Sequence, residues 1–218
     1  MLIGYLSAGE RFSKLLRTKL SIINKKGVIY LEVTAGRVKF NNVLFSYAND
    51  KLIVKKISFT VKGGKTIALI RPTRSSKSIL LNLLKRFIDP SKGSIKINSQ
   101  NISNVTLRSL RENIAVIPQN LKVPNKSIRE IVLYGLHADD VKIVESCKAA
   151  SIHKRIVYCN ARYNMVVRKG GIKLLGSKCQ RIAIIRAFLK NLKILLLDEA
   201  ISAIDNITEK LIRESLKS

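Results

Sequence analysis

The residues best suited to chemistry are Asp198 and Glu199, which directly follow the apolar run ILLL (194–197). A short continuous apolar run predicts a buried strand of a parallel sheet, with both acids at its carboxyl end. A carboxylate in that place can coordinate magnesium. A second one beside it can polarise a water molecule for attack on a phosphate. This pair therefore predicts a phosphoryl-transfer site.

A second candidate site lies upstream, where TIALI (66–70) is followed by RPTRSSKS (71–78). A strand, a short loop and a helix in this order predict a phosphate-binding loop, because backbone N–H groups and a helix N-terminus can surround phosphate oxygens. Lys77 would reach the phosphates and the Ser78 hydroxyl would hold magnesium. The same residues also fit an ordinary connection between a strand and a helix.

Strands and helices alternate along the chain, which predicts an α/β fold with a mostly parallel core. Three kinds of pattern carry this prediction: β-branched runs, apolar residues at helical spacing, and breaks at glycine or before proline. We expect strands at 37–40, 52–61, 66–70, 94–98, 114–118 and 194–198, and helices at 78–87, 127–134, 139–151, 178–190 and 206–217.

Composition excludes several classes of protein. The chain has 218 residues, and its apolar share of 46% excludes bulk disorder. Three cysteines without CxxC spacing argue against a disulfide scaffold or a zinc site. No apolar run reaches the roughly 18–20 residues that cross a bilayer. The net charge of +27 raises the alternative of a nucleic-acid-binding protein, but the bases are spread along the chain without interleaved aromatic residues, which disfavours nucleic acid.

Five segments together resemble the ATP-binding cassette (ABC) family, over about residues 34–218. The sequences of these segments are similar to those of exporter-type B-subfamily members, including mitochondrial half-transporters linked to iron–sulfur metabolism. The similar segments are FSYAND (45–50, A-loop), RPTRSSKSILLNLL (71–84, Walker A), VIPQN (116–120, Q-loop), KLLGSKCQRIAIIRAFLKN (173–191, signature) and ILLLDEAISAID (194–205, Walker B and D-loop).

The resemblance implies a P-loop NTPase-like sheet with flanking helices, an antiparallel β subdomain, and a helical signature subdomain at about 120–185. It implies ATP and Mg²⁺ as cofactors. A second ABC domain in a head-to-tail dimer and a transmembrane domain would be the partners. It places the chain at a membrane, on the cytosolic or matrix side, with a mitochondrial or mitosomal membrane as one expectation.

The resemblance also assigns a role to each matching residue. The implied roles are catalysis by Glu199 and Gln119; nucleotide binding by Tyr47, Thr73, Arg74, Ser75, Ser76, Lys77, Ser78, Ile79 and Asp198; magnesium binding by Ser78, Gln119 and Asp198; signature contacts from Leu175, Gly176 and Ser177; and the D-loop acid Asp205.

Two of these motifs depart from the family pattern. Arg71, Arg74 and Ser76 stand where the family's phosphate loop has glycine. A side chain in left-handed backbone costs roughly 1–2 kcal/mol per residue, so we expect weakened nucleotide binding. In the signature motif, Leu175 replaces a serine that contacts phosphate, and Ser177 replaces a glycine. A catalytically silent ABC subunit or a gene fragment is therefore the alternative to an active domain.

The two ends of the chain complete the sequence-based expectation. Only 13 residues follow Asp205 (218 − 205), and they contain no counterpart of the histidine that the family places further along. We therefore expect 34–218 to be an ABC domain that is truncated and incomplete at its C-terminus. Residues 1–33 are expected to be a connector or the remnant of a last membrane segment, and their basic residues leave a transit peptide as the alternative.

Overall fold

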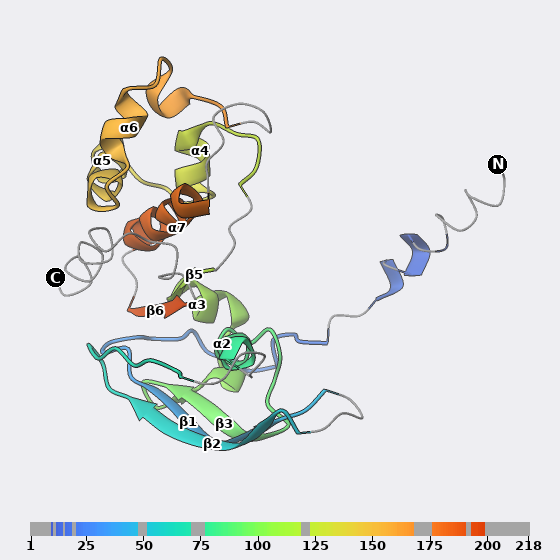
Figure 1. Cartoon of the computed structure of the whole chain (residues 1–218). Helices are drawn as coiled ribbons and strands as arrows, with labels where there is room; N and C mark the ends of the chain where they lie inside the picture. The colour runs from blue at the N-terminus through green and yellow to red at the C-terminus, as the bar shows by residue number, and fades with distance from the viewer. Residues whose placement is uncertain are drawn as a thin grey trace.

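The computed structural model places an antiparallel sheet at one end of the molecule, a helical subdomain at the other, and a short parallel sheet between them (Figure 1). It describes residues 10, 12–14, 16–18, 21–47, 52–70, 77–118, 123–167, 176–190 and 193–198.

The antiparallel sheet has the strand order β2-β1-β3-β4, and its paired strands β1 and β3 are separated by 46 residues of chain (46–91). Side chains alternate between its faces, as expected for strands covered on one side only. Phe40 is buried on the inner face, where its ring stacks on Phe59 at 4.6 Å. The strands are β1 (Val38–Phe45), β2 (Val54–Val61), β3 (Lys92–Ile97) and β4 (Gln100–Asn101).

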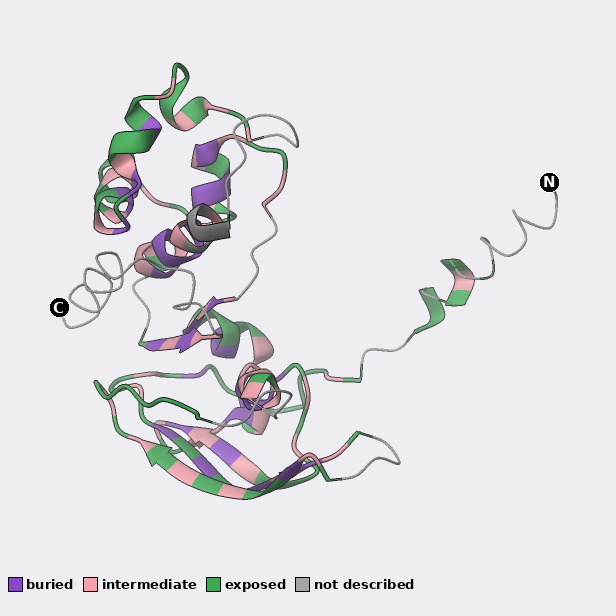
Figure 2. Ribbon diagram, in the orientation of Figure 1, coloured by how far each residue is buried: buried purple, intermediate pink, exposed green. Residues whose placement is uncertain are grey.

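Helix α2 (Lys77–Leu84) covers the inner face of this sheet (Figure 2). Its residues Leu80, Leu83 and Leu84 are buried in one core with the sheet. Gly93 is the second residue of β3 and lies beside a register shift of β1, with a φ of 86°, and a side chain there would meet the Asn42 carbonyl oxygen at 2.3 Å. Glycine is therefore required at this bulge.

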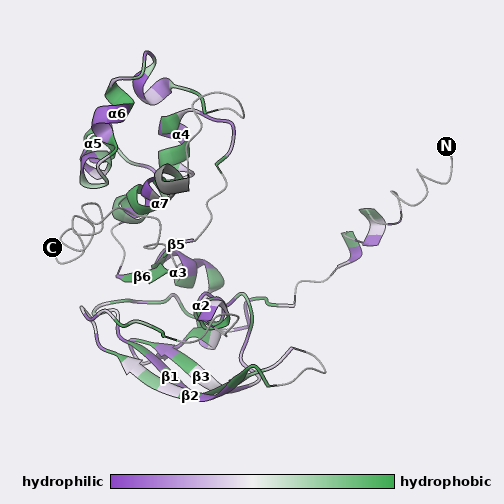
Figure 3. Cartoon of the chain, in the orientation of Figure 1, coloured by the Kyte–Doolittle hydropathy of each residue, from purple (hydrophilic) through white to green (hydrophobic). Residues whose placement is uncertain are grey.

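The parallel sheet consists of β5 (Ile114–Ile117) and β6 (Ile194–Leu197), in register from Ile114↔Ile194 to Ile117↔Leu197. Both strands are apolar throughout, as expected for parallel strands buried on both faces (Figure 3). The 3-10 turn η1 (Ile102–Asn104) and helix α3 (Leu107–Glu112) connect the antiparallel sheet to β5. The predicted strands at 114–118 and 194–198 are thereby confirmed.

The predicted strand at 66–70 is wrong in the described structure. These residues belong to no strand and all five are exposed, with Ile70 at 92%. A strand needs a hydrogen-bonded neighbour, and none of the described strands pairs with this segment. Of the described strands, two form the parallel ladder and four form the antiparallel sheet, so the mostly parallel core stays a prediction.

The helical subdomain has a second core of its own, built around Ile184, Ile185 and Cys147. Helix α4 begins with a capping box, in which the Ser127 hydroxyl accepts from the Glu130 N–H at 3.2 Å and the Glu130 carboxylate accepts from the Ser127 N–H at 3.0 Å. The elements are α4 (Ile128–Leu133), α5 (Asp140–Ala149), α6 (His153–Val157), η2 (Arg162–Asn164) and α7 (Gly176–Lys190).

Four of the five helices predicted from the sequence are present in the structure, and the fifth lies outside the described residues. The predicted helices at 78–87, 127–134, 139–151 and 178–190 correspond to α2, α4, α5 and α7, whereas 206–217 lies outside the described residues. Within the described chain, no helix combines the length and apolarity needed to cross a membrane.

Candidate nucleotide site

The candidate site is built on the edge where β5 and β6 both end. Asp198 follows β6 directly, and its N–H donates to the Ile117 carbonyl oxygen at 3.1 Å. This hydrogen bond extends the parallel ladder by one step and places the half-buried Asp198 at the carboxyl end of the sheet. By chain position Gln119 follows β5 and Glu199 follows Asp198, but both lie outside the described residues.

Helix α2 begins at Lys77, as the phosphate-loop interpretation requires. The next residue, Ser78, is exposed at the first turn, whereas Ile79 is half-buried and packs against the core. The first turn of a helix presents unpaired N–H groups to an anion. Thr73, Arg74, Ser75 and Ser76, which would complete the loop, lie outside the described residues.

Lys85, which the sequence motifs did not single out, belongs to the electrostatics of the site. Burial lowers the pKa of its ammonium group, and the nearby Asp198 carboxylate partly opposes this shift. The Lys85 ammonium, which lies over the Phe87 ring at 4.7 Å, is therefore within electrostatic reach of Asp198. No motif signals this electrostatic interaction, because it joins residues more than a hundred positions apart in the sequence.

Tyr47 lies beyond the end of β1 and is 47% exposed. Its ring meets Phe45 edge-on at a centroid distance of 4.9 Å. This contact fixes one edge of the ring while about half of the side chain stays accessible, and an accessible aromatic face can stack on a nucleobase. The structure thus leaves Tyr47 available for the role that the resemblance implies.

The signature motif is described only from its glycine onward. Gly176 and Ser177 are the first two residues of α7, so this motif opens a helix. Leu175 and Asp205 lie outside the described residues.

The donor set of the described site suits magnesium. Mg²⁺ prefers hard oxygen ligands and usually keeps one or two protein oxygens together with phosphates and water. The Asp198 carboxylate and the exposed Ser78 hydroxyl are such oxygens. Among the described residues no cluster of three or more His, Cys, Asp or Glu forms a softer or all-protein metal site.

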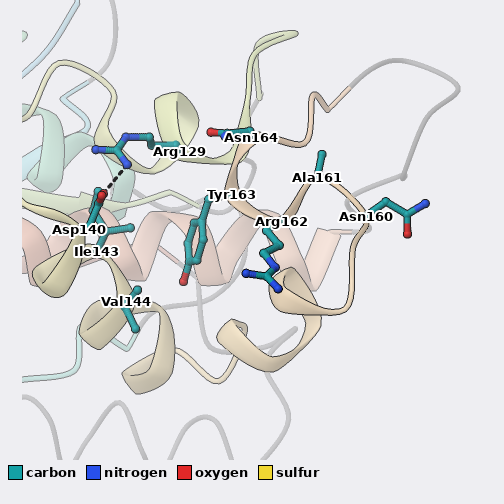
Figure 4. Close-up of a pocket in the computed structure, with 9 residues that line it drawn as sticks. All are labelled: Arg129, Asp140, Ile143, Val144, Asn160, Ala161, Arg162, Tyr163 and Asn164. Carbon is teal, nitrogen blue, oxygen red and sulfur yellow. Dashed lines mark ion pairs between the residues drawn. The ribbon is translucent and has the colours of Figure 1, made fainter.

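A separate hollow of about 400 Å³ lies in the helical subdomain (Figure 4). Arg129 and Asp140 form an ion pair on its rim, and the Tyr163 hydroxyl is hydrogen-bonded to His153 Nδ1 at 2.9 Å. Its lining contains none of the residues expected to bind nucleotide. The lining residues are Arg129, Asp140, Ile143, Val144, Asn160, Ala161, Arg162, Tyr163 and Asn164.

Curated relatives support the predicted resemblance. The chain is 44% identical over 183 residues to ATP-binding cassette sub-family B member 6 of Xenopus tropicalis, covering 84% of this chain and 22% of that protein. It is 40% identical over 208 residues to the heavy metal tolerance protein of Schizosaccharomyces pombe (95% and 25%). It is 39% identical over 184 residues to the mitochondrial iron–sulfur clusters transporter atm1 of Neurospora crassa (84% and 26%).

A solved structure shows the same fold. The structure of a bacterial Atm1-family ABC exporter with ATP bound matches with a TM-score of 0.89 at 34% identity, covering 98% of this chain and 37% of that one. The chain spans about a quarter of the length of the curated relatives named above.

The family profile described as ABC transporter matches residues 54–202, which is more than half of the chain. This range includes α2 with Lys77 and Ser78, the parallel strands, and Asp198, so the phosphate and magnesium part of the described site lies within the matched region. The similarity to sub-family B members and to an Atm1-family exporter confirms the resemblance drawn from the motifs. The chain belongs to the ABC transporter family, as an ATP-binding domain with the ABC ATPase fold.

Proposed function

We propose that this chain is the nucleotide-binding domain of an ABC-type exporter, which binds ATP with Mg²⁺ and couples that binding to transport. The observation that carries the proposal is the placement of Asp198 at the carboxyl edge of the parallel strands, hydrogen-bonded to Ile117 within the family-matched region. Lys77 and Ser78 at the start of α2 supply the cation and the hydroxyl that a triphosphate and its metal need.

Each residue has a distinct task in this proposal. Lys77 and the first turn of α2 hold the phosphates, while Ser78, Asp198 and Gln119 supply oxygen ligands to Mg²⁺. The bound metal would neutralise charge that develops on the transferring phosphate. Glu199 would orient the attacking water, and Tyr47 would stack on the adenine.

We propose weak nucleotide binding and slow turnover. Arg71, Arg74 and Ser76 replace glycines that the phosphate loop uses to turn with positive φ and approach phosphate closely. A cost of roughly 1–2 kcal/mol for each side chain that must take up this backbone conformation to bind phosphate corresponds, over three positions, to a loss of a few orders of magnitude in affinity, at about 1.4 kcal/mol per tenfold. Leu175 offers no hydrogen bond to a phosphate.

The test restores the glycines. We expect the triple variant Arg71→Gly/Arg74→Gly/Ser76→Gly to gain a rise in Tm with millimolar Mg-ATP, measured by thermal denaturation and by calorimetric titration. The matched control is the same triple change to alanine, which removes the same side chains but does not restore glycine's backbone freedom. Equal gains for both variants would show that side-chain bulk, not backbone conformation, limits binding.

Asp198→Asn in the restored-glycine background tests the metal. We expect ATP to bind with a much smaller dependence on Mg²⁺, because an amide is a weaker ligand than a carboxylate. If neither the natural chain nor the glycine-restored variant shifts its Tm with Mg-ATP, the proposal of a nucleotide-binding domain is wrong.

The proposed partners are a second ABC domain, in a head-to-tail dimer with ATP between the two chains, and a transmembrane domain. The matched exporter structure supports them, because this chain covers only 37% of it. The proposed location is the cytosolic or matrix side of a membrane, and the relative from Neurospora crassa, whose name includes the word mitochondrial, supports a mitochondrial one.

A second candidate function is a catalytically silent ABC subunit that completes the site of an active partner. The replacement of the signature serine by Leu175 favours it, because that motif faces the partner's ATP in the family. Co-purification with an active ABC chain, together with unchanged turnover after Glu199→Gln in this chain, would support it. A fall in turnover after Glu199→Gln would argue for an active site here.

A further inference from the structure

The outward face of the antiparallel sheet carries like charges in direct register. Lys39 of β1 is paired with Lys96 of β3, and the residues next to them, Phe40 and Ile95, are buried on the opposite face. Figure 1 shows α2, the parallel strands and the helical subdomain on the inner side of this sheet. The two lysines therefore point away from the body of the protein.

A shallow hollow of about 150 Å³ lies beside this pair, lined by Arg37, Lys39, Lys96 and Ser99. Asn98 and Ser99 turn the chain from β3 to β4 with φ values of 46° and 69°, both left-handed. The Arg37 N–H donates to Asn98 Oδ1 at 2.9 Å, and the Asn98 N–H donates to the Arg37 carbonyl oxygen at 2.8 Å. These bonds hold the Arg37 backbone at the turn, and together with the paired strands they place three cations and the Ser99 hydroxyl around one hollow.

No acid on the strands compensates these charges. The sequences of β1, β2 and β3 contain lysines and no Asp or Glu. In the described part of the chain, none of the recorded ion pairs involves Arg37, Lys39 or Lys96. Like charges placed directly opposite each other destabilise a sheet, so this face bears a cost to folding that an anionic partner would offset.

We propose that this face, defined by Arg37, Lys39 and Lys96 with Ser99, docks on the anionic headgroups of a lipid bilayer. The hollow offers a headgroup phosphate three cations and one hydroxyl donor. The sheet face has no exposed aromatic or large apolar side chain among the described residues. It therefore lacks the stacking platforms that single-stranded nucleic acid needs and the anchors of a protein interface.

The expected strength follows from the charge count. Three basic residues near an anionic bilayer surface contribute a factor of about 100 to binding. This contribution falls steeply with salt, because the Debye length shortens from about 10 Å at 0.1 M to about 3 Å at 1 M ionic strength. Binding through this face should therefore be strong at low salt and lost at high salt.

The experiment measures co-sedimentation of the full chain with phosphatidylcholine vesicles, with and without phosphatidylserine. We expect the natural chain to bind the phosphatidylserine vesicles, and the variant Arg37→Gln/Lys39→Gln/Lys96→Gln to lose about 100-fold in binding. Circular dichroism and thermal denaturation check that the variant is folded. Relief of the like-charge pair should leave its Tm unchanged or higher.

A matched control separates this face from the overall charge of +27. Lys142, Lys148 and Lys154 are exposed on α5 and α6, and their change to glutamine removes the same three charges. We expect this control to keep most of its vesicle binding. Equal losses in both variants, or no binding of the natural chain to phosphatidylserine vesicles, would overturn the proposal. Binding of a uridine oligonucleotide is measured for the same variants. If Arg37→Gln/Lys39→Gln/Lys96→Gln lost oligonucleotide binding but kept vesicle binding, the proposal would also be overturned in favour of nucleic acid.

Discussion

Arg86 is a buried cation whose removal should destabilise the fold. It follows α2, is 1% exposed, and its Nε donates to the Asp89 carboxylate at 3.0 Å. Its Nη1 donates to the carbonyl oxygens of Ile102 and Val105 at 3.3 and 3.5 Å. The change Arg86→Met keeps an unbranched apolar stem and removes every one of these hydrogen bonds.

The magnitude follows from what is left behind. The backbones at Ile102 and Val105 are in a buried environment, and an unsatisfied buried acceptor costs about 1–3 kcal/mol. Breaking a fully buried ion pair costs about 3–5 kcal/mol, but Asp89 is 44% exposed and can be rehydrated. We therefore expect Arg86→Met to lower the free energy of unfolding by about 2–4 kcal/mol.

Urea denaturation followed by circular dichroism measures this change. The control is Arg108→Met, because Arg108 also pairs with an acid through its Nε, at 2.8 Å from Glu112, but its side chain is 85% exposed. We expect no measurable fall in the free energy of unfolding for the control. If Arg86→Met lowers the free energy of unfolding no more than the control does, the buried guanidinium does not hold α2 to η1. A double-mutant cycle with Asp89→Asn isolates the pairwise part.

Three further predictions rest on burial and exposure. Burial raises the pKa of the Cys147 thiol to about 11, so the contribution of the thiol to stability is complete below pH 9 and is lost as pH rises through 11. When the free energy of unfolding from urea denaturation is plotted against pH, Cys147→Ala should therefore flatten the curve between pH 9 and 11. Ile70→Ala should change stability by less than about 0.5 kcal/mol, whereas Ile95→Ala should cost about 2–5 kcal/mol in the same denaturation assay. In the glycine-restored chain, Tyr47→Ala should weaken calorimetric ATP binding more than Tyr47→Phe, since phenylalanine keeps the stacking ring.

Sequence reasoning succeeded where the signal is local. The apolar run before Asp198 predicts a buried strand with an acid at its end, and the structure confirms both. The apolar spacing at 127–134 predicts a helix, and the structure places α4 there. Interactions between distant residues were missed, such as the electrostatic interaction of Lys85 with Asp198, because only the assembled fold brings such residues together.

The segment 66–70 shows why a local pattern is not sufficient. Its β-branched, apolar composition is that of a parallel strand, yet Ile67, Leu69 and Ile70 are all exposed in the described structure. A strand propensity becomes a strand only when a neighbouring strand satisfies its backbone N–H and C=O groups, and β6 is paired with β5 alone among the described strands. The loop that follows is therefore reached by an exposed segment, not by a strand held in a sheet. We therefore expect ATP affinity to depend on two features together, glycines in the loop and a paired strand in front of it. Restoring the glycines alone should recover only part of the affinity.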